Sequence, residues 1–188
     1  MRGWVLSEQG QGEEGILQIH KGLAAFRATG AGIALPFYLA LLATAYEKVG
    51  QVEEGLSVLA EALAVVDRNG ERIYEAELHR LKGELLLQKF QVSSSKLQGP
   101  LNPQHLTPSI QTEVEAEACF LKAIEISRQQ QAKSLELRAT MSLARLWQQQ
   151  GKQKEAHNML SEIYNWFTEG FDTRDLQGAK TLIEELRD

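Results

Sequence analysis

The sequence predicts an all-α protein, a right-handed solenoid of helical hairpins. Three observations support this fold class. Apolar residues recur at spacings of three and four, which places them on one face of a helix. Glycines interrupt the pattern at matching places, and the whole arrangement then repeats along the chain. A fixed period of roughly 20–50 residues is typical of solenoids, so we expect about four hairpins, the first one truncated, and a C-terminal capping helix.

Two copies of the repeat align without gaps. Residues 6–23 read LSEQGQGEEGILQIHKGL, and residues 46–63 read YEKVGQVEEGLSVLAEAL, so that Gly10 corresponds to Gly50. A glycine at the end of a helix adopts a left-handed turn without a steric penalty. Each glycine is therefore predicted to join the first helix of a hairpin to the second.

The two helices of a hairpin are most evident in the second copy, where apolar stripes precede and follow Gly50. The first stripe is Leu39, Leu42, Ala43, Tyr46 and Val49, and the second is Val52, Gly55, Leu56, Leu59, Ala62, Leu63 and Val66. A third copy begins at Trp147, with Gly151 at its turn, and a degenerate copy surrounds Ala116.

Small residues at the start of the second helices reveal an insertion. They are Gly15, Gly55, Ala116 and Ala156, and small side chains allow paired helices to approach closely. The first and last intervals between them are equal, whereas the middle interval is longer and includes residues 91–112. That segment holds three of the four prolines and a run of serines. We expect a single solenoid domain over 1–188 with a long exposed loop at 91–112, and its order stays open.

Both ends of the chain carry helix signals. Thr173 is a helix-start signal, and Leu176, Ala179, Ile183 and Leu186 follow it at helical spacing, which predicts the capping helix. At the other end, the register of the repeat places Trp4 at the end of a helix whose beginning would precede Met1. We therefore expect a piece of a longer solenoid, whose open apolar end could form a homodimer.

Composition narrows the function classes. The 188 residues are 43% hydrophobic and 24% charged, with a net charge of −5, as in an ordinary globular protein. Neither half has a basic excess, so general nucleic-acid binding is not expected. No apolar run reaches the roughly 20 residues that span a bilayer, and no signal peptide precedes the repeats. The expected compartment is the cytoplasm.

No motif predicts catalysis, a cofactor or a metal ion. Residues 10–15 fit G-x-G-x-x-G, but no strand precedes them and two glutamates would face the phosphates, so we interpret them as a helix joint. The four histidines show no ligand spacing, and a phosphate-binding lysine motif is absent. The single cysteine, Cys119, lies beside the apolar stripe and is predicted to be inert.

The candidate functional surface is the inner groove of the solenoid, which the first helix of each hairpin would line. Its predicted residues are Thr44 and Lys48 in the second hairpin, His79 and Arg80 in the third, and Arg138, Met141, Arg145, Gln148 and Gln149 in the fourth. The charged residues among them are all basic, which favours an acidic or carboxylate-bearing peptide. The alternative interpretation is a solvated helix face without a ligand.

The spacing of Leu39, Leu42, Ala43 and Tyr46 resembles the first half of the tetratricopeptide signature, and Thr140, Leu143, Ala144 and Trp147 resemble it again. The period here, about 40 residues, is longer than that of the standard repeat, about 34 residues. The phrases GQVEEGLSVLAEALAVVDRNGERIYEAELHRLKGELLL, EAEACFLKAIEISRQQQAKSLELRATMSLARLWQQQGK and WFTEGFDTRDLQGAKTLIEEL resemble the C-terminal repeats of bacterial adenylate/guanylate-cyclase-like AAA ATPase signalling proteins.

This resemblance implies a non-catalytic sensing or scaffold region, with any catalytic domains outside this chain. Two hypotheses follow from it. The module could bind a separate protein or peptide, or it could act in cis on the ATPase or cyclase domains of its own polypeptide. A separately expressed ATPase segment of the parent should bind only in the second case.

Overall fold

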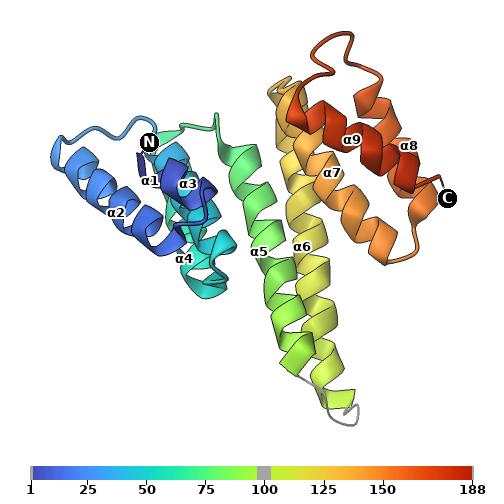
Figure 1. The fold of residues 1–188 in the computed structure, drawn as a ribbon, viewed down its shortest axis with the longest axis horizontal. Coiled ribbons are helices and arrows are strands. Elements are labelled where there is room, and N and C mark those ends of the chain that lie inside the picture. Colours follow the sequence, from blue (N-terminus) through green and yellow to red (C-terminus); the bar gives the residue numbers. More distant parts are fainter. Residues whose placement is uncertain (1, 97–102, 188) are drawn as a thin grey trace.

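The structure is a row of helices. The computed structural model describes residues 2–96 and 103–187, with side chains for 2–92 and 111–187, and no strand occurs in these ranges. The helices are α1 (Arg2–Glu8), α2 (Gly12–Ala28), α3 (Leu35–Lys48), α4 (Val52–Asn69), α5 (Glu75–Lys96), α6 (Pro103–Gln129), α7 (Lys133–Gln149), α8 (Gln153–Tyr164) and α9 (Arg174–Glu185) (Figure 1). The predicted all-α class is confirmed.

The helices pair as hairpins that stack in sequence order. α1 packs on α2, α3 on α4, α5 on α6 and α7 on α8. The first helices also contact one another in the order α1, α3, α5, α7 and α9. Within the described residues, the second helices contact only first helices. One face of the solenoid is therefore built from first helices alone, as the groove hypothesis requires.

The glycine joints form as predicted. Gly10, Gly50 and Gly151 have φ angles of 83°, 73° and 75°. This left-handed conformation suits a residue without a Cβ atom. α1 and α3 end at equivalent positions of the repeat, Glu8 and Lys48, and α2 and α4 also begin at equivalent positions. The first two hairpins are therefore built in the same register.

The core runs between the two helices of each hairpin and on to the next hairpin. Leu39, Leu42 and Ala43 are each 1% exposed, which confirms the predicted stripe. The close approach of paired helices is present at Gly15, where a Cβ atom would lie 2.7 Å from the Gly3 carbonyl oxygen of α1. At Gly55 the close approach is instead to the next hairpin, because a Cβ atom there would lie 2.8 Å from the Leu85 side chain of α5 but 3.5 Å from Cβ of Tyr46 on α3. Buried side chains in the same cluster extend from Ile16 of α2 to Leu85 of α5, so packing ties the first three hairpins together.

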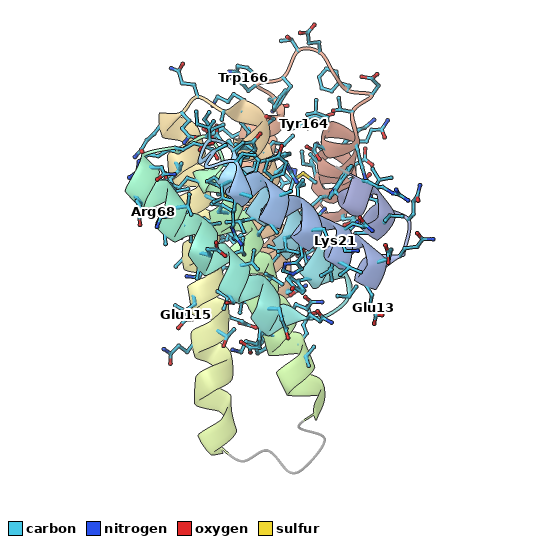
Figure 2. All side chains as sticks on the ribbon, turned by 90° about the vertical axis from the view of Figure 1, so that its left-hand side faces the viewer. Glu13, Lys21, Arg68, Glu115, Tyr164 and Trp166 are labelled. Carbon is cyan, nitrogen blue, oxygen red and sulfur yellow. The ribbon has the colours of Figure 1, made fainter. Side chains whose placement is uncertain are left out.

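The prediction of a loop over 91–112 is wrong at both ends. α5 continues to Lys96 and α6 begins at Pro103, so most of the segment lengthens a helical hairpin that projects beyond the other helices (Figures 1 and 2). Residues 97–102 lie outside the described residues. The prolines predict a loop, but Pro103 is the first residue of α6, where a proline loses no hydrogen bond and has a suitable φ. Pro108 lies inside α6, and this reason does not apply to it.

The terminal elements complete the row. The predicted C-terminal helix is present as α9, and its stripe residues Leu176, Ala179, Ile183 and Leu186 are buried. Trp166, in the segment before α9, lies at the end of the molecule opposite the projecting hairpin (Figure 2). Among the described residues, no helix has the length and hydropathy that crossing a bilayer requires.

Candidate functional site

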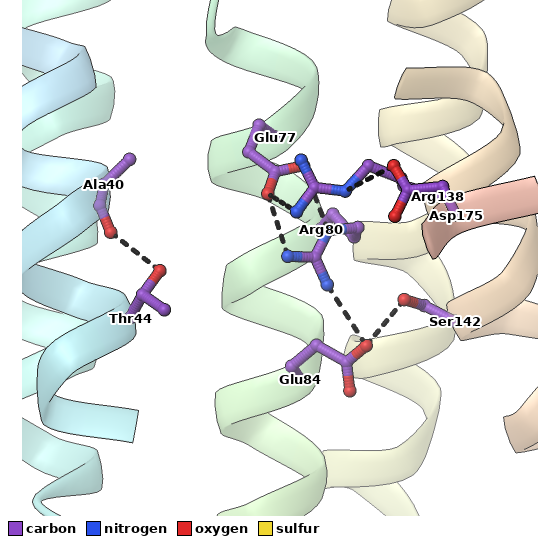
Figure 3. Close-up of polar contacts among 8 residues, drawn as sticks. All are labelled: Ala40, Thr44, Glu77, Arg80, Glu84, Arg138, Ser142 and Asp175. Carbon is purple, nitrogen blue, oxygen red and sulfur yellow. Dashed lines mark hydrogen bonds and ion pairs between the residues drawn. The ribbon is translucent and has the colours of Figure 1, made fainter. Parts of the chain in front are cut away.

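A network of charged side chains crosses the inner face at α5 (Figure 3). The Arg80 side chain is only 13% exposed. Its Nε and Nη2 atoms donate to the two carboxylate oxygens of Glu77, at 3.0 and 2.8 Å. Its Nη1 atom donates to Glu84 at 3.3 Å. These partners are the third residue before and the fourth residue after Arg80, so they share its face of the helix.

Burial and charge act in opposite directions within this network. Burial alone lowers the pKa of Arg80, but the hydrogen bonds and charge of Glu77, with the charge of Glu84, raise it above its usual value. Arg80 therefore stays charged. On α3, burial and the negative charges of Glu84 and Glu77 raise the pKa of Glu47. The face thus gathers carboxylates around a buried guanidinium.

The network continues to the next two first helices. Nη2 of Arg138, on α7, lies 3.0 Å from Oε1 of Glu77. Nε of Arg138 lies 3.8 Å from Oδ2 of Asp175, on α9. The Ser142 hydroxyl donates to Glu84 at 2.5 Å. Close polar contacts therefore join α5 to α7, and the longer Arg138–Asp175 ion pair extends the network to α9.

A pocket of about 250 Å³ opens where these three helices meet. We call it the arginine pocket, and it is lined by Arg80, Arg138, Met141, Ser142, Arg145, Arg174, Asp175 and Gly178. Arg145 and Arg174 are exposed, and neither forms an ion pair with a carboxylate in the described part of the chain. A free guanidinium binds carboxylates or phosphates through two parallel hydrogen bonds. The pocket therefore has the chemistry of an anion site.

The structure brings four of the predicted groove residues together. Arg80, Arg138, Met141 and Arg145 all line the arginine pocket. Gly178 of α9 lies close to Met141, because a Cβ atom at Gly178 would lie 3.2 Å from Cε of Met141.

The other predicted groove residues lie elsewhere. Thr44 donates to the carbonyl of Ala40 on its own helix at 3.0 Å and stands apart from the charged network (Figure 3). Lys48 forms an ion pair with Glu8 of α1 at 2.5 Å. Both residues remain on α3, away from the pocket lining.

His79 belongs to a different side of α5. Burial lowers its pKa, and the charges that act on it include Lys122 of α6 and Asp67 of α4, which are second helices. Gln148 is half-buried and Gln149 exposed near the end of α7, and neither lines the arginine pocket. The predicted groove residues therefore do not form one continuous site.

The expectation that the charged groove residues are all basic is wrong, because it omitted Glu77, Glu84 and Asp175. The sequence does indicate two of these carboxylates, because the spacing of Glu77 and Glu84 from Arg80 predicts ion pairs on one helix face. Arg174 and Asp175 were missed because α9 was interpreted only as a cap. However, α9 also packs on α7, in the position that the first helix of a further hairpin would occupy.

Other residues considered for chemistry have structural surroundings. α2 begins at Gly12 and follows helix α1, so the glycine-rich stretch of residues 10–15 joins two helices. Burial raises the pKa of the half-buried Cys119 thiol, which disfavours the reactive thiolate. The described residues contain no group of three or more metal-ligating side chains.

Comparison with solved structures identifies the fold as that of tetratricopeptide-like repeat solenoids. Two similar crystal structures are of nearly identical TPR-like repeats from a proposed kinesin light chain of Podosopora anserina, one of them a single-substitution variant. The variant has a TM-score of 0.63 and 17% identity, over 98% of this chain and 89% of its own. The second has a TM-score of 0.62 and 17% identity, over 98% and 90%. Neither protein-family profiles nor curated proteins give a match.

Proposed function

We propose that this protein is a non-catalytic interaction module that holds a carboxylate-bearing peptide against its inner face. The TPR-like fold is typical of protein–protein interaction. The observation that carries the proposal is the arginine pocket, in which Arg145 and Arg174 have no carboxylate partner among the described residues. Two guanidinium groups that line one pocket without a carboxylate partner among the described residues favour an anionic ligand group.

The size of the pocket indicates what enters it. Pockets for drug-sized ligands measure roughly 300–1,000 Å³. The arginine pocket, at about 250 Å³, is smaller. It suits one aspartate or glutamate side chain, or a terminal carboxylate, while the rest of the peptide lies along the first helices.

The surrounding network prepares the pocket for binding. Arg138 is held by Glu77 at 3.0 Å, so little side-chain entropy is lost when a ligand arrives. Its Nε atom lies 3.8 Å from Asp175, which exceeds a hydrogen bond, so this N–H group remains available to a ligand carboxylate. Binding would then use Arg138 together with Arg145 and Arg174.

A pull-down from the source cell's lysate tests this proposal. The bait proteins are the wild type, Arg145→Glu with Arg174→Glu, and the control Lys154→Glu, which reverses an exposed charge on α8. We expect a protein that the wild type and the control capture and the double variant loses. Capture by all three baits alike would contradict a role for the arginine pocket. Reversal of Arg138 is avoided because it would also break the contacts with Glu77 and Asp175.

We further propose that the module belongs to a larger cytoplasmic signalling ATPase or cyclase, on the strength of the sequence resemblance described above. In the cis form of this proposal, the carboxylate comes from another domain of the same polypeptide. A separately expressed ATPase segment of the parent should then bind the wild type and lose affinity for the double variant. Binding of unrelated cellular proteins alone would favour a free adaptor.

A further inference from the structure

The arginine pocket presents more hydrogen-bond donors than one carboxylate can accept. Arg145 on α7 and Arg174 on α9 line it, and neither guanidinium group donates to another described residue. Each guanidinium group is a planar fork of N–H donors, two of which match the two oxygens of a carboxylate. One carboxylate can therefore form this two-bond pair with only one of the two arginines.

The two arginines also reach the pocket from different helices. α7 and α9 pack on each other, and Met141 of α7 lies close to Gly178 of α9 within the lining. Arg145 and Arg174 therefore belong to two different walls of the pocket. A carboxylate is planar, whereas a phosphate monoester is tetrahedral and offers three strong acceptor oxygens that point in different directions. A phosphate group can accept hydrogen bonds from both walls at once.

A third arginine completes the set of donors. Arg138 is already oriented by Glu77, whose Oε1 atom lies 3.0 Å from Nη2. Its Nε atom lies 3.8 Å from Asp175, beyond hydrogen-bond distance, so this N–H group is available to another oxygen. Three arginines of the lining thus correspond to the three terminal oxygens of a phosphate monoester.

The charges of the lining admit such an anion. Its four arginines meet a single carboxylate, Asp175, whose side chain is 49% exposed and therefore screened by solvent. Glu77 and Glu84 do not line the pocket and accept hydrogen bonds from Arg80. A phosphate monoester carries a charge of about −1.5 to −2 at pH 7, so this lining attracts it more strongly than a carboxylate.

We propose that the arginine pocket binds a phosphorylated serine or threonine side chain of the partner peptide, so that phosphorylation of the partner strengthens its binding. This inference rests on the proposed function, because it names the ligand group of the same pocket. An aspartate or glutamate at that position of the peptide is then a weaker ligand, and an unphosphorylated serine is the weakest.

Binding of the full chain to immobilised peptide pools tests the proposal. The pools have degenerate flanks and one fixed central residue, which is serine, glutamate or phosphoserine. We expect the phosphoserine pool to bind at least about tenfold more tightly than the glutamate pool, and the serine pool to bind least tightly. A glutamate pool that binds as tightly as the phosphoserine pool, and more tightly than serine, would overturn this inference and leave the proposed function standing. Equal binding of all three pools would overturn both.

Variants locate the phosphate group. Arg174→Gln removes the donors of one wall at an exposed residue, so the fold should remain intact. We expect it to weaken binding of the phosphoserine pool by more than about tenfold and that of the glutamate pool by less than about threefold. Lys154→Glu, the exposed control on α8, should change neither. Equal losses for both pools in Arg174→Gln, or an unchanged preference for phosphoserine, would overturn the proposal.

The ionisation of the phosphate gives an independent readout. Its second pKa is about 6, whereas a glutamate carboxylate, with a pKa of about 4.3, stays ionised above pH 5. The described lining holds arginines and one aspartate but no histidine. The advantage of phosphoserine over glutamate should therefore shrink between about pH 7.5 and 5.5, and an unchanged ratio would contradict phosphate recognition.

Competition identifies the source of the phosphate group. Inorganic phosphate should displace the phosphoserine pool only at much higher concentrations than a soluble phosphoserine peptide does, because the rest of the peptide also contacts the first helices. Equal competition by inorganic phosphate would make a free anion the ligand and overturn the proposal.

Discussion

Oε1 of Glu77 on α5 lies 3.0 Å from Nη2 of Arg138 on α7, and the same carboxylate also accepts two hydrogen bonds from Arg80. One carboxylate thus joins two consecutive first helices and neutralises a buried guanidinium. Arg138 reaches on toward Asp175 of α9. The geometry of the arginine pocket therefore depends on a side chain that does not line it.

Glu77→Gln should destabilise the fold by about 2–4 kcal/mol, because Arg80 would keep its charge in a buried place without its main partner. Urea unfolding at neutral pH measures the change. The control is Glu53→Gln, which removes the partner of Lys89 in a pair whose side chains are 70% and 44% exposed. That loss should stay below about 1 kcal/mol. Similar losses in both variants would contradict the assigned role of Glu77.

Gly83→Ala and Gly22→Ala should change stability in opposite directions. A Cβ atom at Gly83 would collide with the ring of Phe120, which is completely buried, so overpacking of about 1–3 kcal/mol should exceed the gain in helix propensity. At Gly22 the space is open, so the variant should show only the gain in helix propensity, which raises the free energy of unfolding by roughly 0.5–1 kcal/mol. Thermal unfolding distinguishes the two. Stabilisation of both variants would show that α5 and α6 are less closely packed.

Glu47→Gln should raise stability at neutral pH. Burial and the charges of Glu84 and Glu77 raise the pKa of Glu47, so its ionised form disfavours the folded state. The wild type gains stability from this group as pH falls through the raised folded pKa, and loses it as pH rises. The difference between variant and wild type should therefore shrink toward pH 4.5, the usual pKa. A difference that does not depend on pH would reject this explanation.

Glu136→Gln should show the reverse dependence. Burial alone raises the pKa of Glu136, but hydrogen bonds from Arg128 and Lys133, each 2.7 Å long, lower it below its usual value of 4.5. Its contribution to stability is therefore present above pH 4.5 and is lost as pH falls through the lowered pKa. The variant should lose about 1–3 kcal/mol at pH 7. Melting curves at several pH values check this, and an equal loss in strong acid would count against it.

The fold was predictable from sequence because its joints and core carry local signals. Gly10, Gly50 and Gly151 mark turns that need a left-handed residue, and Leu39 and Leu42 repeat at helical spacing. The extension of α5 and α6 was not predictable from composition, because prolines and serines near helix ends resemble those of loops. That the whole chain forms one domain stays a prediction.

The candidate site was predictable only in part. Arg80, Arg138, Met141 and Arg145 could be placed on one face from the repeat register, and the structure brings them into one pocket. Which carboxylates pair with these arginines depends on how α5, α7 and α9 are spaced, and the sequence of one helix does not determine that spacing.

The central claim is that the arginine pocket selects carboxylates, and a charge-reversal experiment on a peptide array tests it most directly. The array holds matched peptides that are identical except at their acidic positions. The acidic members carry aspartate or glutamate there, and the others carry asparagine, glutamine or lysine. Wild type should prefer the acidic members, Lys154→Glu should keep that preference, and Arg145→Glu with Arg174→Glu should lose it and gain affinity for lysine peptides. A double variant that remains folded and still prefers the acidic members would contradict the claim.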